Sequence, residues 1–224
     1  MAGSPVVALV PAAGRGTRLG SSTPKAFVEL GGVPMVRRAV DGLLASGVVD
    51  AVVVAVPPEL AGTAADLLPD GVQVVAGGEH RIDSVRAAMA VAPDAGIYLV
   101  HDAARALAPP DLIARVVAEL RSGRKAVVPA LPPADTVKSV DLLGGVTGTL
   151  TRSELRLVQT PQGFEADLLR RAYAEAPDGA EFTDDAGLVE HIGGRVRAIT
   201  GDPHAFKVTT ALDVTLAEAL LAAD

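Results

Sequence analysis

Cysteine and tryptophan are both absent from this chain of 224 residues. Without cysteine the protein has no disulfide, no thiolate nucleophile and no zinc–sulfur site. Aromatic residues make up only 3% of the chain, so the apolar fraction of 49% consists mainly of Val, Leu, Ile and Ala. A chain of this size buries about 70% of the surface that it exposes when unfolded. We therefore expect an aliphatic core that needs no metal or disulfide to hold it together.

Basic residues are also scarce, because 20 Lys and Arg stand against 27 Asp and Glu and give a net charge of −7. That balance argues against non-specific binding to nucleic acid. Long apolar runs are missing too: the longest uncharged run, residues 1–14, is too short to span a membrane. No basic residues precede this run, and it ends in a glycine-rich basic segment rather than a signal cleavage site. We expect a cytoplasmic protein that binds neither nucleic acid nor membrane.

Short valine-rich runs alternate with amphipathic stretches along the chain. The expected strands are residues 6–10, 51–56, 72–76, 97–101, 126–131, 155–159 and 196–199. The expected helices are residues 34–46, 59–68, 81–92, 110–122, 165–176, 184–192 and 212–222. This alternation predicts an α/β fold with a Rossmann-like, doubly wound, mostly parallel sheet. The length favours a single domain over residues 1–224, with ligands beyond the carboxyl ends of the strands.

One segment, residues 136–152, breaks this rhythm with the sequence TVKSVDLLGGVTGTLTR. Polar and apolar residues alternate on both sides of Gly144-Gly145, which predicts a β-hairpin. Little in the hairpin could join the main core, so we expect it to project. A projecting ribbon usually pairs with something, and a second copy of the chain is the simplest partner. Residues 134–154 are therefore the expected dimerisation arm of a homodimer.

A glycine-rich segment follows the first expected strand and reads PAAGRGTRLG over residues 11–20, with Pro24-Lys25 shortly after. Such a turn lets backbone N–H groups approach phosphate oxygens closely, and Arg18 and Lys25 add positive charge at the same edge. The glycine spacing misses the dinucleotide-binding fingerprint by one residue and lacks the ending of a P-loop. Phosphate binding is the favoured interpretation, and a tight turn is the alternative.

Several polar residues follow other strands at the same edge. Asp102, directly after the strand at 97–101, could hold Mg²⁺ against triphosphate oxygens, or could instead cap a helix or pair with Arg105. His101 could be a general base, although a packed, hydrogen-bonded histidine is the simpler interpretation. Gly77-Gly78 would let a flat base lie against the backbone, with Ser84 bonded to its edge, unless this is a plain turn.

These motifs occur in an order that resembles one family of nucleotidyltransferases. The segments are Ala12-Ala13-Gly14 to Arg18, Pro24-Lys25, Gly77-Gly78-Glu79 to Val85, His101-Asp102-Ala103-Ala104-Arg105, Asp135-Thr136 with Lys138, Gln159-Thr160-Pro161-Gln162, Thr183-Asp184-Asp185, and Gly201-Asp202 with Lys207-Val208-Thr209. Together they are similar to the 2-C-methyl-D-erythritol 4-phosphate cytidylyltransferases of the non-mevalonate isoprenoid route. The resemblance runs from Pro11 to about Glu218. It implies that CTP and 2-C-methyl-D-erythritol 4-phosphate react to give the diphosphocytidyl alcohol and pyrophosphate, with Mg²⁺ bound to the nucleotide.

The resemblance also implies roles for individual residues. Those expected to act in catalysis are Arg18, Lys25, Arg152 and Lys207, where Arg152 would serve the site of the partner chain. The expected nucleotide-binding residues are Ala12, Ala13, Gly14, Gly16, Gly77, Gly78, Ser84, Asp102 and Ala103. Arg105, Thr136 and Thr183 are expected at the second substrate, and Asp102 at the metal. The chain departs from the family at Ala106, often proline, and at Ala205, often an asparagine that could support the Lys207 loop. The alternatives are a ribitol-5-phosphate cytidylyltransferase and a non-catalytic nucleotide-binding subunit.

Overall fold

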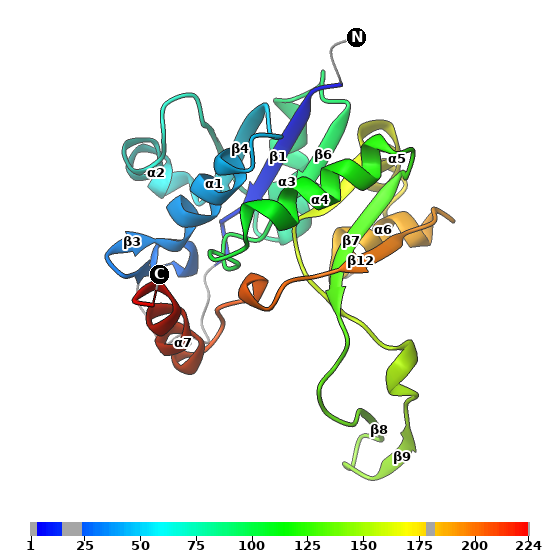
Figure 1. Ribbon diagram of the computed structural model, residues 1–224. Helices are drawn as coiled ribbons and strands as arrows, with labels where there is room; N and C mark the ends of the chain where they lie inside the picture. The colour runs from blue at the N-terminus through cyan, green and yellow to red at the C-terminus, as the bar shows by residue number, and fades with distance from the viewer. Residues whose placement is uncertain (1–3, 15–23, 178–181, 224) are drawn as a thin grey trace.

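The computed structural model describes residues 4–14, 24–177 and 182–223 (Figure 1). Its centre is an eight-stranded sheet in which β1 lies between β6 and β4. The strand order is β10 (Leu157–Val158), β7 (Ala126–Leu131), β11 (Gln162–Glu165), β6 (Ile97–Val100), β1 (Val6–Pro11), β4 (Ala51–Val56) and β5 (Gln73–Ala76), with β12 (Arg197–Thr200) also paired to β7. The pairs β1–β4, β1–β6, β4–β5 and β7–β12 are parallel. The expected mostly parallel α/β sheet is confirmed.

Helices cover both faces of this sheet. One face packs against α1 (Met35–Ala45), α2 (Ala61–Leu67) and α4 (Pro110–Arg121), and the other against α3 (Arg81–Ala90), α5 (Ala166–Ala174) and α6 (Asp185–His191). Strand β1 shows why. Val6, Ala8 and Val10 belong to the first core, whereas Val7 and Leu9 belong to the second. Because successive side chains of a strand point to opposite faces, a continuous apolar run needs a helix layer on each side.

Strand β11 was not expected from the sequence. It is antiparallel to both of its neighbours, β6 and β7, and separates these two parallel strands. A Cβ atom on Gly163 would lie only 2.6 Å from side-chain carbons of Val116 and Leu120. Glycine is therefore required at this point, because α4 packs directly against the backbone of the strand.

Smaller elements gather at the carboxyl edge of the sheet. They are the 3₁₀ turns η2 (Lys25–Phe27), η3 (Pro58–Leu60) and η5 (Pro203–Ala205), the short pair β2 (Glu29–Leu30) and β3 (Val33–Pro34), and the last helix, α7 (Ala211–Leu221). A separate apolar cluster holds α7 in place through Leu30, Met35, Val208 and Ala217, and it includes Ala106. This packing fixes the loop that precedes α7 against the edge where ligands are expected.

The predicted hairpin is present and projects from the sheet (Figure 1). It consists of β8 (Lys138–Val140) and β9 (Val146–Thr149), which form a two-stranded sheet of their own, followed by the turn η4 (Arg152–Glu154). Leu142 and Leu143 at its tip are 105% and 96% exposed. None of the helices in the described part of the chain is long and apolar enough to cross a membrane.

Candidate active site

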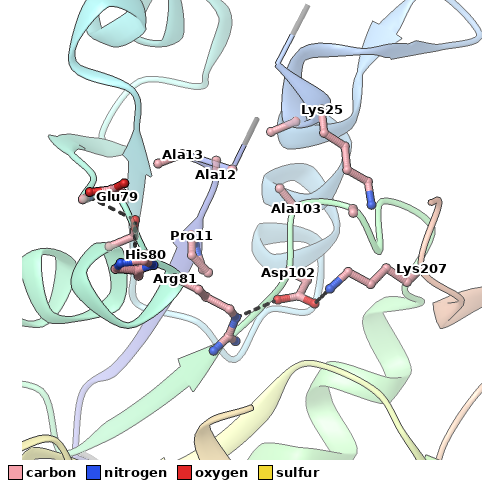
Figure 2. A pocket seen from close by; sticks show the side chains of 15 residues that line it. Pro11, Ala12, Ala13, Lys25, Glu79, His80, Arg81, Asp102, Ala103 and Lys207 are labelled. Carbon is pink, nitrogen blue, oxygen red and sulfur yellow. Dashed lines mark hydrogen bonds and ion pairs between the residues drawn. The ribbon is translucent and has the colours of Figure 1, made fainter. Parts of the chain in front are cut away.

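A pocket opens beyond the carboxyl ends of β1 and β6, beside the loop that follows β5 (Figure 2). This is where ligands bind in doubly wound sheets. Most of the residues expected at the site line it: Ala12, Ala13, Gly14, Lys25, Gly78, Ser84, Asp102, Ala103 and Lys207. Pro11, Ala26, Glu79, His80, Arg81 and Ala104 complete the wall. The sheet edge thus brings together segments that are up to 196 positions apart in the sequence.

Lys25, Arg81 and Lys207 bring positive charge to this pocket, and Arg81 is the one to which the sequence assigned no role. It lies in the first turn of α3, three residues after the second of the paired glycines. The guanidinium donates to Asp102 Oδ1 over 3.3 Å and to Asp185 Oδ2 over 2.7 Å. Burial alone would lower the pKa of Arg81, but the two facing carboxylates outweigh this effect and raise it. The only signal in the sequence was a cation placed just after a glycine pair.

Asp102 lies at the floor of the pocket between two cations (Figure 2). Its Oδ1 faces Arg81, and its Oδ2 accepts a hydrogen bond of 2.8 Å from Lys207 Nζ. Burial would raise the pKa of this carboxyl, but Arg81 and Lys207, with a smaller effect from Arg105, hold it well below its usual range. Within the described ranges the side chain pairs with Arg81 and Lys207 rather than with a helix N-terminus, and Arg105 acts on it electrostatically without a direct ion pair.

Gly77 and Gly78 follow β5, where the backbone passes close to two other segments. A Cβ on Gly77 would meet the Cβ of Ala13 at 2.6 Å, and one on Gly78 would meet the Cβ of Asp83 at 2.3 Å. Ser84 is buried, and its hydroxyl accepts from the Gly78 N–H over 3.2 Å. These contacts fix the loop after β5 against the glycine-rich loop after β1. Gly77 itself lies behind the lining, whereas Gly78 and Ser84 belong to it.

His101 is a packed histidine, as the simpler interpretation held. It is 1% exposed, and its Nδ1 lies 3.0 Å from Thr160 Oγ1. Burial lowers the pKa of His101 to about 4, because the effect of burial exceeds the opposing one of Asp102. The ring is therefore neutral at neutral pH.

This neutral histidine predicts a pH-dependent stability. The unfolded chain binds a proton at His101 near pH 6.5 and the native chain only near pH 4, so the free energy of unfolding should fall as the pH falls through this window. Between pH 7 and pH 5 we expect His101 to account for a loss of about 2 kcal/mol. Urea unfolding of the parent and of His101→Asn at both pH values measures it. Equal losses in the two proteins would contradict the prediction.

The segment Gln159-Thr160-Pro161-Gln162 braces the loops around the pocket. The Gln159 side chain donates to Asp202 O over 2.8 Å and accepts from Asp202 N over 2.9 Å, which fixes the start of the loop that carries Lys207. The Thr160 hydroxyl accepts from the backbone N–H of Asp102 over 3.0 Å. Both residues are buried, and both position neighbours of the site without lining it.

Gln162 positions the start of α6 through its side-chain hydrogen bonds. Its amide donates to Asp184 Oδ2 over 2.8 Å and accepts from the Ala186 N–H over 3.0 Å. Asp184 in turn caps the helix by accepting from the Gly187 N–H. Carboxylates at the start of a helix stabilise its N-terminus. The structure assigns that role to Asp184, whereas Asp185 is buried against Arg81.

Arg105, expected at the second substrate, holds two backbone segments together instead of lining the pocket. Its guanidinium donates to Ala205 O over 2.7 Å and to Val158 O over 3.1 Å. Arg105 therefore fixes the Lys207 loop through the backbone of Ala205, although the side chain at this position is only a methyl group. Contact between Arg105 and substrate stays a prediction.

The other residues expected at the second substrate do not line the pocket of their own chain. Thr136 and Arg152 lie exposed at the base of the arm, where Arg152 Nη1 donates to Ala134 O over 2.9 Å. Thr183 is exposed just before α6. Two further expected residues, Gly16 and Arg18, lie outside the described residues. Their roles stay predictions.

A larger hollow, about 680 Å³, lies at the amino end of β7. Its wall includes Arg124, Lys125, Arg171 and Arg197, but Arg124, Lys125 and Arg171 face nearby Glu119, Glu165 and Glu175. Of the described residues expected to carry the chemistry, none lines it. Size alone therefore does not identify the site, and the carboxyl-edge pocket is the candidate.

Comparison with known proteins agrees with this geometry. The family model described as 2-C-methyl-D-erythritol 4-phosphate cytidylyltransferase matches residues 6–223. This chain belongs to that family. The cytidylyltransferase of this name from Rhodococcus opacus (strain B4) is 69% identical over 217 residues, which cover 97% of this chain and 95% of the relative. That from Nocardia farcinica (strain IFM 10152) is 66% identical over 218 residues, covering 96% and 94%.

Solved structures of 2-C-methyl-D-erythritol 4-phosphate cytidylyltransferases share the fold. The crystal structure of the protein from Thermus thermophilus is 36% identical, with a TM-score of 0.78 and coverage of 97% of this chain and 98% of that one. The 4-diphosphocytidyl-2C-methyl-D-erythritol synthase from Anaerococcus prevotii DSM 20548 is 26% identical, with a TM-score of 0.85 and coverage of 98% and 99%. This chain is thus an enzyme of the non-mevalonate isoprenoid route, a CTP-dependent cytidylyltransferase. The ribitol-5-phosphate and non-catalytic alternatives are not favoured.

Proposed function

We propose that the pocket at the carboxyl ends of β1 and β6 is where the cytidylyl group of CTP is transferred to 2-C-methyl-D-erythritol 4-phosphate. One observation carries this assignment: the loop Ala12–Gly14, Lys25 and Lys207 line a single pocket. The loop offers backbone N–H groups to a triphosphate. The two lysine side chains lie on the same side of the pocket (Figure 2). Their positive charges offset the repulsion between the two polyanionic substrates.

The reaction is an in-line substitution at phosphorus. An oxygen of the alcohol's phosphate attacks the α-phosphorus of CTP, and the bond from this phosphorus to the bridging oxygen of the β-phosphate breaks. Pyrophosphate leaves with the electron pair of that bond. The attacking phosphate monoester is already an anion, so no protein base is needed, in keeping with the buried, neutral His101. Positioning and charge neutralisation therefore dominate the barrier.

Each cation has a place in this scheme. Lys25, together with Arg18, stabilises the negative charge that develops on the α-phosphate and the leaving pyrophosphate. Lys207 holds the attacking phosphate from within the chain, and the partner's Arg152 holds it from the second chain. Asp102 keeps the Lys207 amine beside the pocket through their 2.8 Å hydrogen bond.

Magnesium fits this pocket best as the ion that accompanies CTP. Two carboxylates line the wall, Glu79 and Asp102, and the described ranges contain no cluster of three or more His, Cys, Asp or Glu residues placed to hold a metal. Mg²⁺ is commonly held by one or two carboxylates with substrate phosphates and water. Both Asp102 oxygens face cations, so direct contact requires one cation to withdraw. When bound, the ion neutralises charge on the triphosphate.

We further propose that residues 1–224 form a single nucleotidyltransferase domain and that the arm joins two copies in a homodimer. The arm carries the exposed Val140, Leu142, Leu143 and Val146. Monomeric proteins rarely expose such a group of apolar side chains, and a second copy would cover them. Arg152, at the base of the arm, would then reach the partner's pocket. The expected cytoplasmic location stays a prediction.

CTP should be strongly preferred over UTP. The two bases differ at one edge, where cytosine presents an amine donor and uracil a carbonyl acceptor. A buried polar group left without its partner costs about 1–3 kcal/mol, so we expect kcat/KM for CTP to exceed that for UTP by about 10- to 100-fold. Pyrophosphate release with each nucleotide measures the ratio. Ribitol 5-phosphate in place of the methylerythritol substrate is the control for the second substrate. Equal values for the two nucleotides would contradict the assignment of the nucleotide pocket.

A further inference from the structure

A continuous line of hydrogen bonds runs from the helix layer behind the sheet to Lys207. The Tyr173 hydroxyl donates to Asp185 Oδ1 over 2.5 Å, and Asp185 Oδ2 accepts from Arg81 Nη2 over 2.7 Å. Arg81 Nε donates to Asp102 Oδ1 over 3.3 Å, and Asp102 Oδ2 accepts from Lys207 Nζ over 2.8 Å. Figure 2 shows the last two links across the floor of the pocket. The line joins α5, α6 and α3 to the loop before α7.

Asp185 is the unusual member of this line, because its side chain is completely buried. A buried carboxylate is costly unless it is paired, and a buried ion pair is often no more stabilising than apolar residues of the same volume. The start of α6 does not need it, since Asp184 caps the helix and Gln162 fixes it. The local structure of α6 therefore gives no reason for a carboxylate at position 185.

The contact with Arg81 explains why a carboxylate stands at position 185. An arginine side chain has many rotamers, and hydrogen bonds from its planar guanidinium to two carboxylates restrict it to few of them. Asp185 accepts from Nη2 of the guanidinium inside the protein, and Asp102 accepts from Nε at the pocket. With Oδ1 of Asp102 held in this way, Oδ2 is turned toward Lys207. The Lys207 side chain is itself 42% exposed, and its ion pair with Asp102 is what anchors the amine at the pocket.

We propose that Asp185 is a positioning residue for the transfer reaction: through Arg81 it orients Asp102, and through Asp102 it holds the amine of Lys207 where the attacking phosphate binds. This rests on the proposed role of Lys207. The charge of Asp185, rather than its shape, performs the task. It touches neither substrate, and its effect falls on the second substrate rather than on CTP.

Steady-state kinetics of Asp185→Asn test this role, because asparagine keeps the shape and can still accept from Tyr173. We expect kcat/KM for 2-C-methyl-D-erythritol 4-phosphate to fall about 10- to 100-fold, with KM for CTP changed less than about threefold. Glu190→Gln, an exposed position on the same helix, is the matched control and should behave as the parent. Tyr173→Phe keeps the charge of Asp185 and should lose less than about fivefold. An equal effect of Asp185→Asn on both substrates overturns the proposal.

A double-mutant cycle shows whether Asp185 acts through Lys207. In a Lys207→Ala background, Asp185→Asn should change kcat/KM less than about twofold, because the amine that it positions is gone. Losses that multiply overturn the proposal. If Asp185→Asn does not fold, the paired variant Arg81→Gln/Asp185→Asn replaces it, since it leaves no buried charge without a partner, and the same result is expected.

A labelling experiment separates this proposal from the role of Lys207 itself. The rate at which an acylating reagent modifies Lys207, followed by peptide mass spectrometry, should rise at least about threefold in Asp185→Asn, because the amine is no longer held against Asp102. Lys125, at the opposite edge of the sheet, is the internal control and should not change. An unchanged Lys207 rate overturns the positioning role. A raised rate, together with a Lys207→Ala variant of normal activity, supports the positioning and overturns the proposed function of Lys207.

Discussion

Replacing Lys25 by alanine should lower kcat by about 10²–10³, which is the loss seen when one preorganised charge-stabilising group is removed. Lys25 lines the pocket at the start of η2, and the next two residues, Ala26 and Phe27, are buried in the core beneath α1. These anchors fix the backbone of the turn independently of the lysine side chain. The substitution should therefore remove a positive charge from the pocket and leave the fold intact.

Steady-state kinetics with saturating CTP measure this loss, and thermal unfolding checks the fold. Lys125→Ala is the matched control, because Lys125 is an exposed lysine at the opposite edge of the sheet that pairs with Glu165. It should keep the activity of the parent. Arg18→Ala is expected to behave like Lys25→Ala on sequence grounds. Activity of Lys25→Ala within tenfold of the parent would contradict the role given to this lysine.

Heterodimers of two inactive variants should recover about half of the parental activity if the arm crosses between chains. Arg152→Ala and Lys25→Ala homodimers should each be nearly inactive, since every site lacks one of the two cations. In a heterodimer, one site carries both substitutions and the other carries neither. Arg152 lies at the base of the arm and does not line the pocket of its own chain, which is the observation that motivates this test.

Co-expression of differently tagged chains and tandem purification give heterodimers of defined composition. Heterodimers of each variant with the parent chain are the controls, and each should also keep about half of the activity, because one site remains complete. If verified heterodimers of the two variants stay as inactive as the homodimers, Arg152 acts within its own chain and the crossing arm is wrong.

The apolar pattern of the sequence predicted most of the sheet but not its central antiparallel strand. The run at 6–10 became β1 because its alternating residues fill two cores. Strand β11 was not predicted because Gln162-Gly163-Phe164-Glu165 has neither a valine-rich run nor a clear alternation of polar and apolar residues. Its place between β6 and β7 depends on Gly163 fitting beneath α4, which is a tertiary contact. The hairpin was predictable, since its alternation and glycine turn are local.

The functional site, like the sheet, has features that the sequence predicts and features that it does not. Glycine-rich loops and single polar residues after strands can be recognised locally, and Asp102, Lys25 and Gly78 all line the pocket as expected. The contacts that hold these residues in place were not predictable. Gln159 bonds to a backbone 43 positions away, and Arg81 to a carboxylate 104 positions away. Such partners follow from how the helices pack, which the spacing of residues in one sequence does not specify.

The position of β11 also determines when the sheet can be completed during synthesis. Strands β6 and β7 are separated in the native sheet by residues 162–165, which follow the whole arm in the sequence. While the chain is translated from the N-terminus at about 5–20 residues per second, the first 131 residues contain both flanking strands but not the one between them. The edges of β6 and β7 stay open until the arm, with its exposed leucines, has been made. Completion of the pocket at the carboxyl edge is therefore a late event, because Thr160, which fixes Asp102, emerges together with β11.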